Sequence, residues 1–327
     1  MDHNGVCTKM APQGCYKFMS FPSNTVINAR LPYDASYVYN DIRYKNRWDF
    51  YTSRTCNTFI ISHLSYFCKS FFNDIMVGMS EKVISDYNGY DYKKEFWENV
   101  DREYEDQADR MAIRKLLPKR MESFADIGGG YGRLANEYLK RARKVYIFDY
   151  SKTELAQAKE IYGDKVETKA GDIYKLPFRD NELDGLMMIR VTHHLKDMPK
   201  AIAELYRVLK PGGVAVIEVA NKRTLPKIAR FVTRRSKVNP FDKKVANYKE
   251  ISKDGFYNYH PKYVEEIFEK VGFKREKVLS VSNFRSKGLK KMFGTNNLVK
   301  MENKAQQALA PIRFAPSIYY KLRKPEN

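Results

Sequence analysis

The sequence has few cysteines, and none lies beyond residue 68. The four are Cys7, Cys15, Cys56 and Cys68. Their spacing matches neither a CxxC motif nor the paired spacing of a zinc site, and it does not indicate a disulfide framework. The later part of the chain therefore has no candidate catalytic cysteine and no cysteine metal site.

Long apolar runs and a secretory signal are also missing. The most apolar window, residues 58–79, is interrupted by polar and charged side chains that a bilayer span rarely contains: His63, Lys69, Asn73 and Asp74. Residues 1–10 lack a basic start followed by an apolar stretch. We expect no transmembrane segment, and a location in the cytoplasm or peripherally at the inner membrane surface.

Glutamate is absent from the first 75 residues and appears first at Glu81. This change in composition divides the chain. We expect residues 1–75 to be a poorly ordered appendage, or an upstream extension that is not made in the cell, with Met76 or Met79 as the true start. Residues 76–120 would then be an N-terminal helical cap, and residues 121–327 the working domain.

Acidic residues are too few to balance the basic ones. The chain has 59 Lys and Arg against 39 Asp and Glu, a net charge of +20. Residues 1–75 hold eight basic and five acidic residues, so +17 belongs to the later part. Such an excess makes an anionic partner, nucleic acid or a membrane surface, the first class to test.

A glycine-rich turn marks the start of the working domain. An apolar stretch from Glu122 ends at Asp126, and glycines follow at 128, 129, 130 and 132 before a helical pattern through Leu134, Tyr138 and Leu139. Strand, glycine turn and helix form the opening unit of a nucleotide-binding α/β fold. Glycines let the backbone approach a ligand where a Cβ would clash.

Further apolar runs also end in acids. Residues 144–149 end at Asp149, about 20 residues after the glycines, where a carboxylate binds a ribose, and residues 165–172 end in Gly171 and Asp172. Strands are expected at 183–191 and 214–220, with a helix at 198–209 between them. This alternation predicts a doubly wound parallel sheet with helices on both faces, and ligands at the carboxyl ends of its strands.

The glycine pattern departs from two common nucleotide sites. Arg133 occupies the sixth position of GxGxxG, where a dinucleotide site needs glycine or alanine, and a P-loop lysine is missing. Instead, residues 85–325 resemble the class I S-adenosylmethionine-dependent methyltransferases, in particular the type 11 group with the quinone-biosynthesis C-methyltransferases. The motifs that carry the resemblance are 126–132, Asp149, 171–172, 176–178, Asp184, 193–195 and 207–213.

The resemblance implies a Rossmann-like, seven-stranded sheet and S-adenosyl-L-methionine as cofactor. The 126–132 loop would hold the methionine end and ribose, Asp149 the ribose diol, and Asp172 with Ile173 the adenine. The cofactor-binding set it implies is Asp126, Gly128, Gly129, Gly130, Gly132, Asp149, Tyr150, Asp172, Ile173 and Arg190. His194 would be the general base or simply a wall residue; no metal is implied.

Segments at the edges of the domain are candidates for acceptor recognition. Residues 91–117 have the pattern of an amphipathic helix, either a cap over the cofactor or a packing helix. Residues 221–260 and 285–311 are basic insertions, expected as helical lids over the active face. A basic amphipathic stretch within 222–249 suits a membrane surface or an anionic substrate, although such runs are also simply solvated. A sixth strand is expected at 276–284, and the family's last strand, at 316–322, inserts antiparallel at the sheet edge.

These observations predict an S-adenosylmethionine-dependent methyltransferase acting on a small or lipid-like acceptor by in-line methyl displacement. The first alternative is a tRNA or rRNA methyltransferase, although the sequence lacks an RNA-binding module and an Asn/Asp-Pro-Pro-Tyr motif. The second is a cofactor-binding accessory protein without catalysis. The oligomeric state and the acceptor atom are not indicated.

Overall fold

The structure is a computed structural model that describes part of the chain. Its described residues are the backbone of 10–11, 14–20 and 26–30, residue 97, and residues 101–248 and 256–326. Two compact units, Met1–Glu81 and Lys82–Asn327, are considered separately. In the first, strands β1 (Met10–Ala11), β2 (Gly14–Ser20) and β3 (Val26–Arg30) form an antiparallel sheet. The sequence analysis assigned no element there, and its proposal for residues 1–75 stays a prediction.

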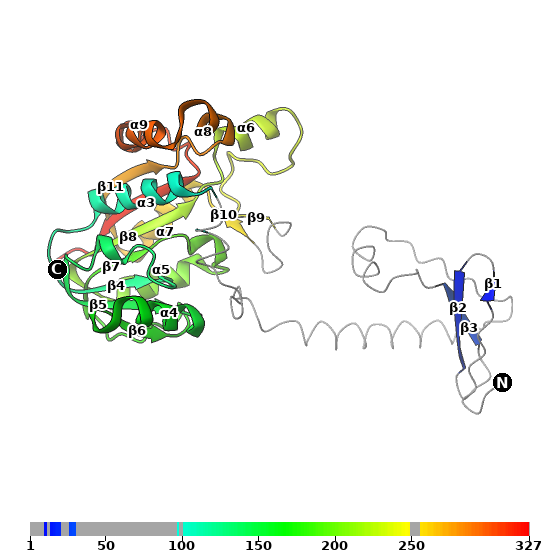
Figure 1. Cartoon of the computed structure of the whole chain (residues 1–327), viewed down its shortest axis with the longest axis horizontal. Coiled ribbons are helices and arrows are strands. Elements are labelled where there is room, and N and C mark those ends of the chain that lie inside the picture. The colour runs from blue at the N-terminus through cyan, green and yellow to red at the C-terminus, as the bar shows by residue number, and fades with distance from the viewer. Residues whose placement is uncertain are drawn as a thin grey trace. The chain divides into compact units, whose positions relative to one another are not determined.

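The second unit is built on a seven-stranded sheet (Figure 1). Its strand order is β11-β12-β8-β7-β4-β5-β6. The five strands from β8 to β6 pair in parallel, whereas β12 is antiparallel to both of its neighbours. The strands are β4 (Met121–Ile127), β5 (Ala142–Asp149), β6 (Glu167–Ala170), β7 (Leu183–Met188), β8 (Leu209–Ala220), β11 (Lys274–Val281) and β12 (Ser317–Arg323).

The expected doubly wound sheet with an antiparallel last strand is confirmed, but the expected place of that strand is wrong. β12 lies between β8 and β11, and β11 forms the edge. Seven pairs of residues join β12 to β8, from Ser317 opposite Ala220 to Arg323 opposite Val214. The near-continuous burial of β12 agrees with this interior position, because a strand with two neighbours and two covered faces is mostly apolar.

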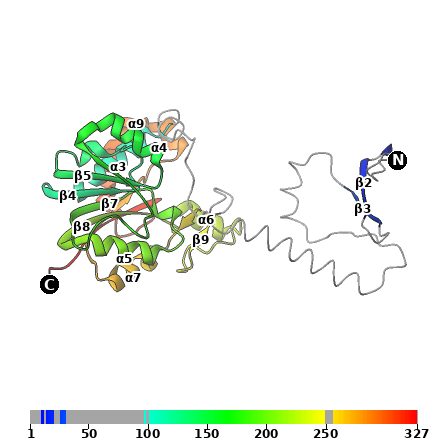
Figure 2. The ribbon, with the colours of Figure 1, turned by 90° about the horizontal axis from the view of Figure 1, so that it is seen from below.

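Helices cover both faces of the sheet (Figure 2). One apolar cluster packs side chains of α3 and α4 against one face, and the other cluster packs side chains of α5 and α7 against the opposite face. α9 adds to the layer of α3, where the Tyr104 hydroxyl donates to Glu302 at 2.6 Å. The helices are α3 (Glu103–Leu116), α4 (Lys152–Tyr162), α5 (Met198–Val208), α7 (Pro261–Val271) and α9 (Thr295–Ala308).

The helix expected after the glycine turn is absent, and that prediction was wrong. Residues 134–139 contain a 3-10 turn, Ala135–Glu137. The Ala135 amide donates to the Gly132 carbonyl at 2.9 Å, three residues back, and the Glu137 amide donates likewise to Leu134. Leu134, Ala135 and Tyr138 are nevertheless buried as an amphipathic helix would bury them. Apolar spacing alone therefore could not separate the tight turn from a helix.

The two basic insertions have different structures. The described part of residues 221–260 contains α6 (Leu225–Val232) and a two-stranded sheet of β9 (Ala246–Asn247) and β10 (Tyr257–Asn258). Residues 285–311 form α8 (Lys287–Phe293) and α9. Because α9 packs on α3, the second insertion helps to cover a face of the sheet. No described helix is long and apolar enough to span a bilayer.

Candidate functional site

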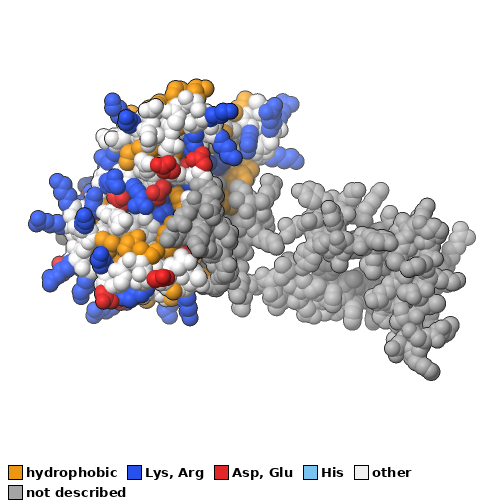
Figure 3. All heavy atoms as spheres, viewed as in Figure 1, with side chains coloured by type: hydrophobic (Ala, Val, Ile, Leu, Met, Phe, Trp, Pro, Cys, Tyr) orange, Lys and Arg blue, Asp and Glu red, His pale blue; other side chains and the backbone are white. Residues whose placement is uncertain are grey.

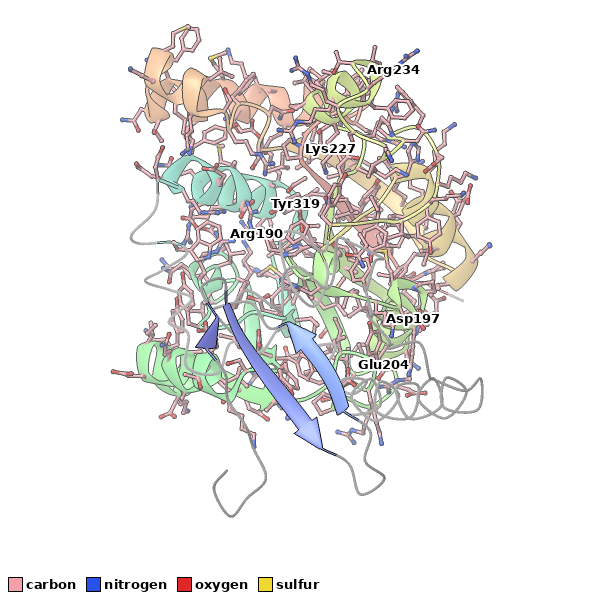
Figure 4. The ribbon with its side chains drawn as sticks, turned by 90° about the vertical axis from the view of Figure 1, so that its right-hand side faces the viewer. Arg190, Asp197, Glu204, Lys227, Arg234 and Tyr319 are labelled. Carbon is pink, nitrogen blue, oxygen red and sulfur yellow. The ribbon has the colours of Figure 1, made fainter. Side chains whose placement is uncertain are left out.

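A cavity lies at the carboxyl ends of β4, β5 and β7, and Figure 4 views this side of the molecule. Turns that follow these strands and the end of β6 supply its walls, and Trp97 adds an aromatic ring. Most of the predicted site residues line it, namely Asp126, Gly128, Gly129, Gly130, Asp149, Tyr150, Asp172, Ile173, Arg190 and His194. Gly132 does not belong to this lining but shapes the turn.

The glycine turn is fixed against the neighbouring strand. The amides of Gly128 and Gly129 both donate to the Phe148 carbonyl, at 2.7 and 3.1 Å. Gly128 has φ of +73°, and a Cβ there would lie 2.2 Å from a methyl group of Val191. Gly130 also has a positive φ, +53°. Only glycine combines this backbone with such a close approach, so Gly128 lets the turn pack directly against Val191.

Asp149 faces the glycine turn from the end of β5. One carboxylate oxygen accepts a hydrogen bond from the Gly130 amide at 2.8 Å, and the other accepts from the Ser151 amide at 2.9 Å. Burial raises its pKa, and these amides oppose that effect. The side chain is only partly covered, so each oxygen can accept one more hydrogen bond from a ligand.

Asp126 is more deeply buried than Asp149. Its carboxylate accepts a hydrogen bond from the Tyr138 hydroxyl at 2.9 Å. Burial is the main reason why its pKa is raised to about 7, although the Tyr138 hydrogen bond lowers it. A Cβ at Gly129 would lie 2.8 Å from this carboxylate. Asp126 therefore supports the turn from beneath as well as lining the cavity.

The loop after β6 is tied to the loop after β7. Asp172 is exposed, and its carboxylate accepts from the Tyr174 amide at 2.9 Å. The Tyr174 hydroxyl accepts from the amides of Lys196 and Asp197, at 3.1 and 3.0 Å. The segment that carries His194 is thereby held near the Asp172 loop.

Arg190 is held by an acidic residue that the sequence analysis did not single out. Asp109, on α3, forms a bidentate pair with the Arg190 guanidinium and also pairs with Arg133 at 2.9 Å. Asp109 is fully buried, and these two cations outweigh burial and keep its pKa low. The guanidinium carbon of Arg133 lies 3.7 Å from the Trp97 ring centroid, a cation–π contact.

The two histidines after β7, His193 and His194, lie close together. Their ring centroids are 4.1 Å apart, with the planes tilted by 51°. Within the described residues, no group of three His, Cys, Asp or Glu side chains is placed to hold a metal ion. Burial lowers the pKa of His194 to about 4, so its imidazole is neutral at pH 7.

Comparison with known proteins identifies the family. Residues 125–217 match the family model described as a methyltransferase domain. The chain is 28% identical over 207 residues to a probable S-adenosylmethionine-dependent methyltransferase of Mycolicibacterium smegmatis, covering 63% of this chain and 69% of that protein. This part of the chain is an S-adenosylmethionine-dependent methyltransferase domain.

Two other relatives are named as quinone methyltransferases. The chain is 31% identical over 155 residues to the 2-phytyl-1,4-naphtoquinone methyltransferase of Nostoc punctiforme, covering 45% of this chain and 66% of that protein. It is 32% identical to the demethylmenaquinone methyltransferase of Symbiobacterium thermophilum, with coverage of 34% and 49%. The chain thus spans about half to two thirds of these quinone enzymes.

A solved structure supports the fold of the methyltransferase. A S-adenosylmethionine-dependent methyltransferase of Thermotoga maritima superposes with a TM-score of 0.52 at 17% identity, covering 74% of this chain and all of that one. At this identity the likeness concerns the fold. Sequence and fold together confirm the expected family and its cofactor, S-adenosyl-L-methionine.

The residues of the methyltransferase fit this cofactor. The turn has a positive φ at Gly130, and the space beside it is open because this residue has no Cβ. A Cβ there would lie 3.2 Å from a carboxylate oxygen of Glu154 and 3.9 Å from one of Asp149. Trp97, Asp109 and Glu154 were missed by the sequence analysis. Glu154 follows Asp149 by five residues and reaches back to the turn because Ser151 caps α4 with a hydrogen bond from the Glu154 amide.

Proposed function

We propose that the methyltransferase transfers the methyl group of S-adenosyl-L-methionine to a small or lipid-like acceptor at the carboxyl edge of the sheet. The observation that carries the proposal is the cavity that the glycine turn, Asp149 and His194 line together, with Asp149 bonded to the turn through the Gly130 amide. The quinone methyltransferases among its relatives support an apolar, ring-bearing acceptor.

The cofactor is assigned to the predicted residues. The 126–132 turn would hold the methionine end and ribose, with Asp149 on the ribose diol, because its oxygens retain lone pairs after binding the Gly130 and Ser151 amides. Asp172, Ile173 and Tyr150 would surround the adenine at the more open end of the cavity. Arg190 would form part of the cavity wall, where its side chain is fixed by the hydrogen bond to Asp109.

The bound cofactor supplies an activated methyl group on a sulfonium. The protein then has to hold the acceptor in line and exclude water, since positioning can supply much of the rate. His194 would take a proton from an acceptor that must lose one, because burial keeps its imidazole neutral at pH 7. An acceptor that carries no such proton would leave His194 as a wall residue.

A peripheral membrane contact through the basic stretch 222–249 is part of the proposal. α6 exposes Leu225 and Val232, at 59% and 69%, and Arg230 is also exposed. Lys and Arg side chains project from this region of the surface (Figure 3). Exposed apolar and basic side chains on one helix favour binding to an anionic lipid surface, from which a lipid-like acceptor could be taken.

Production of S-adenosylhomocysteine tests the acceptor class. The full chain is incubated with S-adenosyl-L-methionine and with lipid, quinone or tRNA fractions. We expect the lipid or quinone fraction to stimulate product release. Stimulation by tRNA alone would contradict the proposal and favour the nucleic-acid alternative. Cofactor binding without turnover on any fraction would favour an accessory protein.

A further inference from the structure

We infer that α8 is a second membrane-binding element, which inserts Met292 and Phe293 into an anionic lipid bilayer beside α6. The inference rests on the proposed function, in which the membrane contact is confined to the stretch 222–249. It adds a helix from the other insertion, residues 285–311. It also assigns part of the contact to apolar side chains that enter the bilayer.

The exposed apolar side chains of the second unit are concentrated in or next to its two insertions. In the described part of the chain, ten large apolar side chains are exposed, and eight of them lie between residues 225 and 312. Met292 is the most exposed of all, at 73%. Such a concentration indicates contact with an apolar partner. The eight are Leu225, Val232, Phe241, Val245, Met292, Phe293, Met301 and Ile312.

The anchoring of α8 turns Met292 away from the rest of the unit. Lys290 pairs with Glu105 of α3 at 2.8 Å, and only 8% of the Lys290 side chain is exposed. Met292 follows Lys290 by two residues, which is about 200° around an α-helix, and therefore points to the opposite side. A largely buried ion pair thus fixes the direction of the most exposed apolar side chain.

The charge around these side chains suits an anionic surface. Residues 285–301 contain five Lys and Arg and no Asp or Glu, and residues 222–241 contain seven and none. Lys287 and Lys291 are exposed on α8 itself. Apolar side chains flanked by basic ones favour the interface of an anionic bilayer. A second copy of the chain would bring the same positive charge to this surface, which opposes self-association.

The two basic helices lie at the same end of the second unit. Figures 1 and 4, seen from directions 90° apart, both show α6 and α8 side by side. A bilayer can therefore contact both helices at once, which strengthens binding beyond that of either helix alone. α6 begins five residues after the carboxyl end of β8, so this docking also holds the carboxyl edge of the sheet near the lipid.

Fluorescence quenching by brominated phospholipid tests the insertion. Phe293→Trp places a reporter on α8, and Ile161→Trp on α4 is the matched control, because the two side chains are 43% and 45% exposed. Each full-length variant is mixed with vesicles of phosphatidylglycerol and acyl-chain-brominated phosphatidylcholine, and the spectrum of the wild type is subtracted. We expect the emission of Phe293→Trp to shift to shorter wavelength and to be quenched, and that of Ile161→Trp to stay unchanged. Equal quenching at both positions, or none at position 293, overturns the inference.

Sedimentation with vesicles of phosphatidylglycerol measures the contribution to affinity. Replacing both Met292 and Phe293 by Ser should weaken vesicle binding about tenfold or more, the loss expected when a large apolar side chain no longer enters the bilayer. Ile161→Ser should change it less than about twofold. Wild-type affinity for S-adenosylhomocysteine shows that each variant is folded.

The outcomes separate the inference from the proposed membrane contact. Wild-type binding to vesicles with equal affinities in the double variant and in Ile161→Ser overturns the role of α8 and leaves the contact through 222–249 in place. A lower molecular mass of the double variant in light scattering, without loss of vesicle binding, also overturns it and assigns α8 to a contact between copies of the chain. Failure of the wild type to bind vesicles contradicts both.

Discussion

The carboxylate of Asp109 binds the guanidinium of Arg190 through two hydrogen bonds, of 2.8 and 3.1 Å. The same carboxylate accepts a hydrogen bond from the Tyr319 hydroxyl at 2.8 Å. Asp109 lies on α3, Arg190 follows β7, and Tyr319 belongs to β12. One buried acid therefore joins the helix before the sheet to the cavity wall and to the last strand.

Asp109→Asn should destabilise the fold strongly. The substitution removes the carboxylate that pairs with the Arg190 guanidinium, whereas Arg133 keeps its pair with Asp106, and loss of one partner of a buried pair costs about 3–5 kcal/mol. Urea unfolding of the wild type and the variant measures the difference. Tyr319→Phe, which removes a single hydrogen bond, should cost about 0.5–1.5 kcal/mol. Equal losses in the two variants would contradict a central role of the Asp109 charge.

Asp126 should make the apo protein less stable as the pH rises. Its folded pKa of about 7 lies above the ordinary value of 3.8, so between these values the folded state binds the proton more tightly than the unfolded state. The free energy of unfolding contributed by Asp126 should therefore fall from about pH 4 to pH 7, by roughly 1.4 kcal/mol per pKa unit. Urea unfolding of the wild type relative to Asp126→Asn isolates the effect. A difference that is flat or rises with pH would rule it out.

His194 should remain neutral throughout the range from pH 5 to pH 8. Burial lowers its pKa to about 4, so the stability linked to His194 is lost as the pH falls from about 6.5 toward 4. Nuclear magnetic resonance of the histidine ring carbons follows the titration, and His194→Gln assigns the signal. A midpoint near 6.5 would show that the ring is solvated and not built into the wall.

The basic face around α6 should bind anionic membranes. Replacing Arg230, Arg234 and Arg235 by Glu reverses three exposed charges, and each basic residue near such a surface contributes about 1 kcal/mol. Sedimentation with vesicles of anionic phospholipid should show a loss of binding of 100-fold or more, with cofactor affinity unchanged. The charge-matched control replaces Arg120, Arg143 and Lys165, which lie at the amino ends of β4, β5 and β6. Equal losses in both triple variants would contradict a specific face.

Local patterns were sufficient to predict which residues line the cavity at the carboxyl ends of the strands. Strand ends at Asp126 and Asp149 and the glycines between them lie close in sequence, and their chemistry is visible in the residue types. The helix expected at 198–209 also agrees with α5 within one residue, because a capping residue and a proline mark its start.

Long-range pairs could not be predicted in this way. Asp109 and Arg190 are 81 residues apart, and Tyr319 is 210 residues from Asp109, so only the folded chain brings them together. The apolar spacing of 134–139 predicted a helix because a buried 3-10 turn has nearly the same pattern. The place of β12 depends on its pairing with β8 and β11, which sequence spacing does not reveal.

The most direct test of the cofactor site is calorimetry of S-adenosyl-L-methionine binding to the wild type and to Asp149→Ala. We expect the wild type to bind and the variant to lose about 1.5–3 kcal/mol of binding free energy, the contribution of a charge-assisted hydrogen bond. Asp164→Ala, at an exposed acid after α4, should bind as the wild type does. Unchanged affinity in Asp149→Ala would contradict the assignment of this carboxylate to the ribose, and no binding by the wild type would contradict the site as a whole.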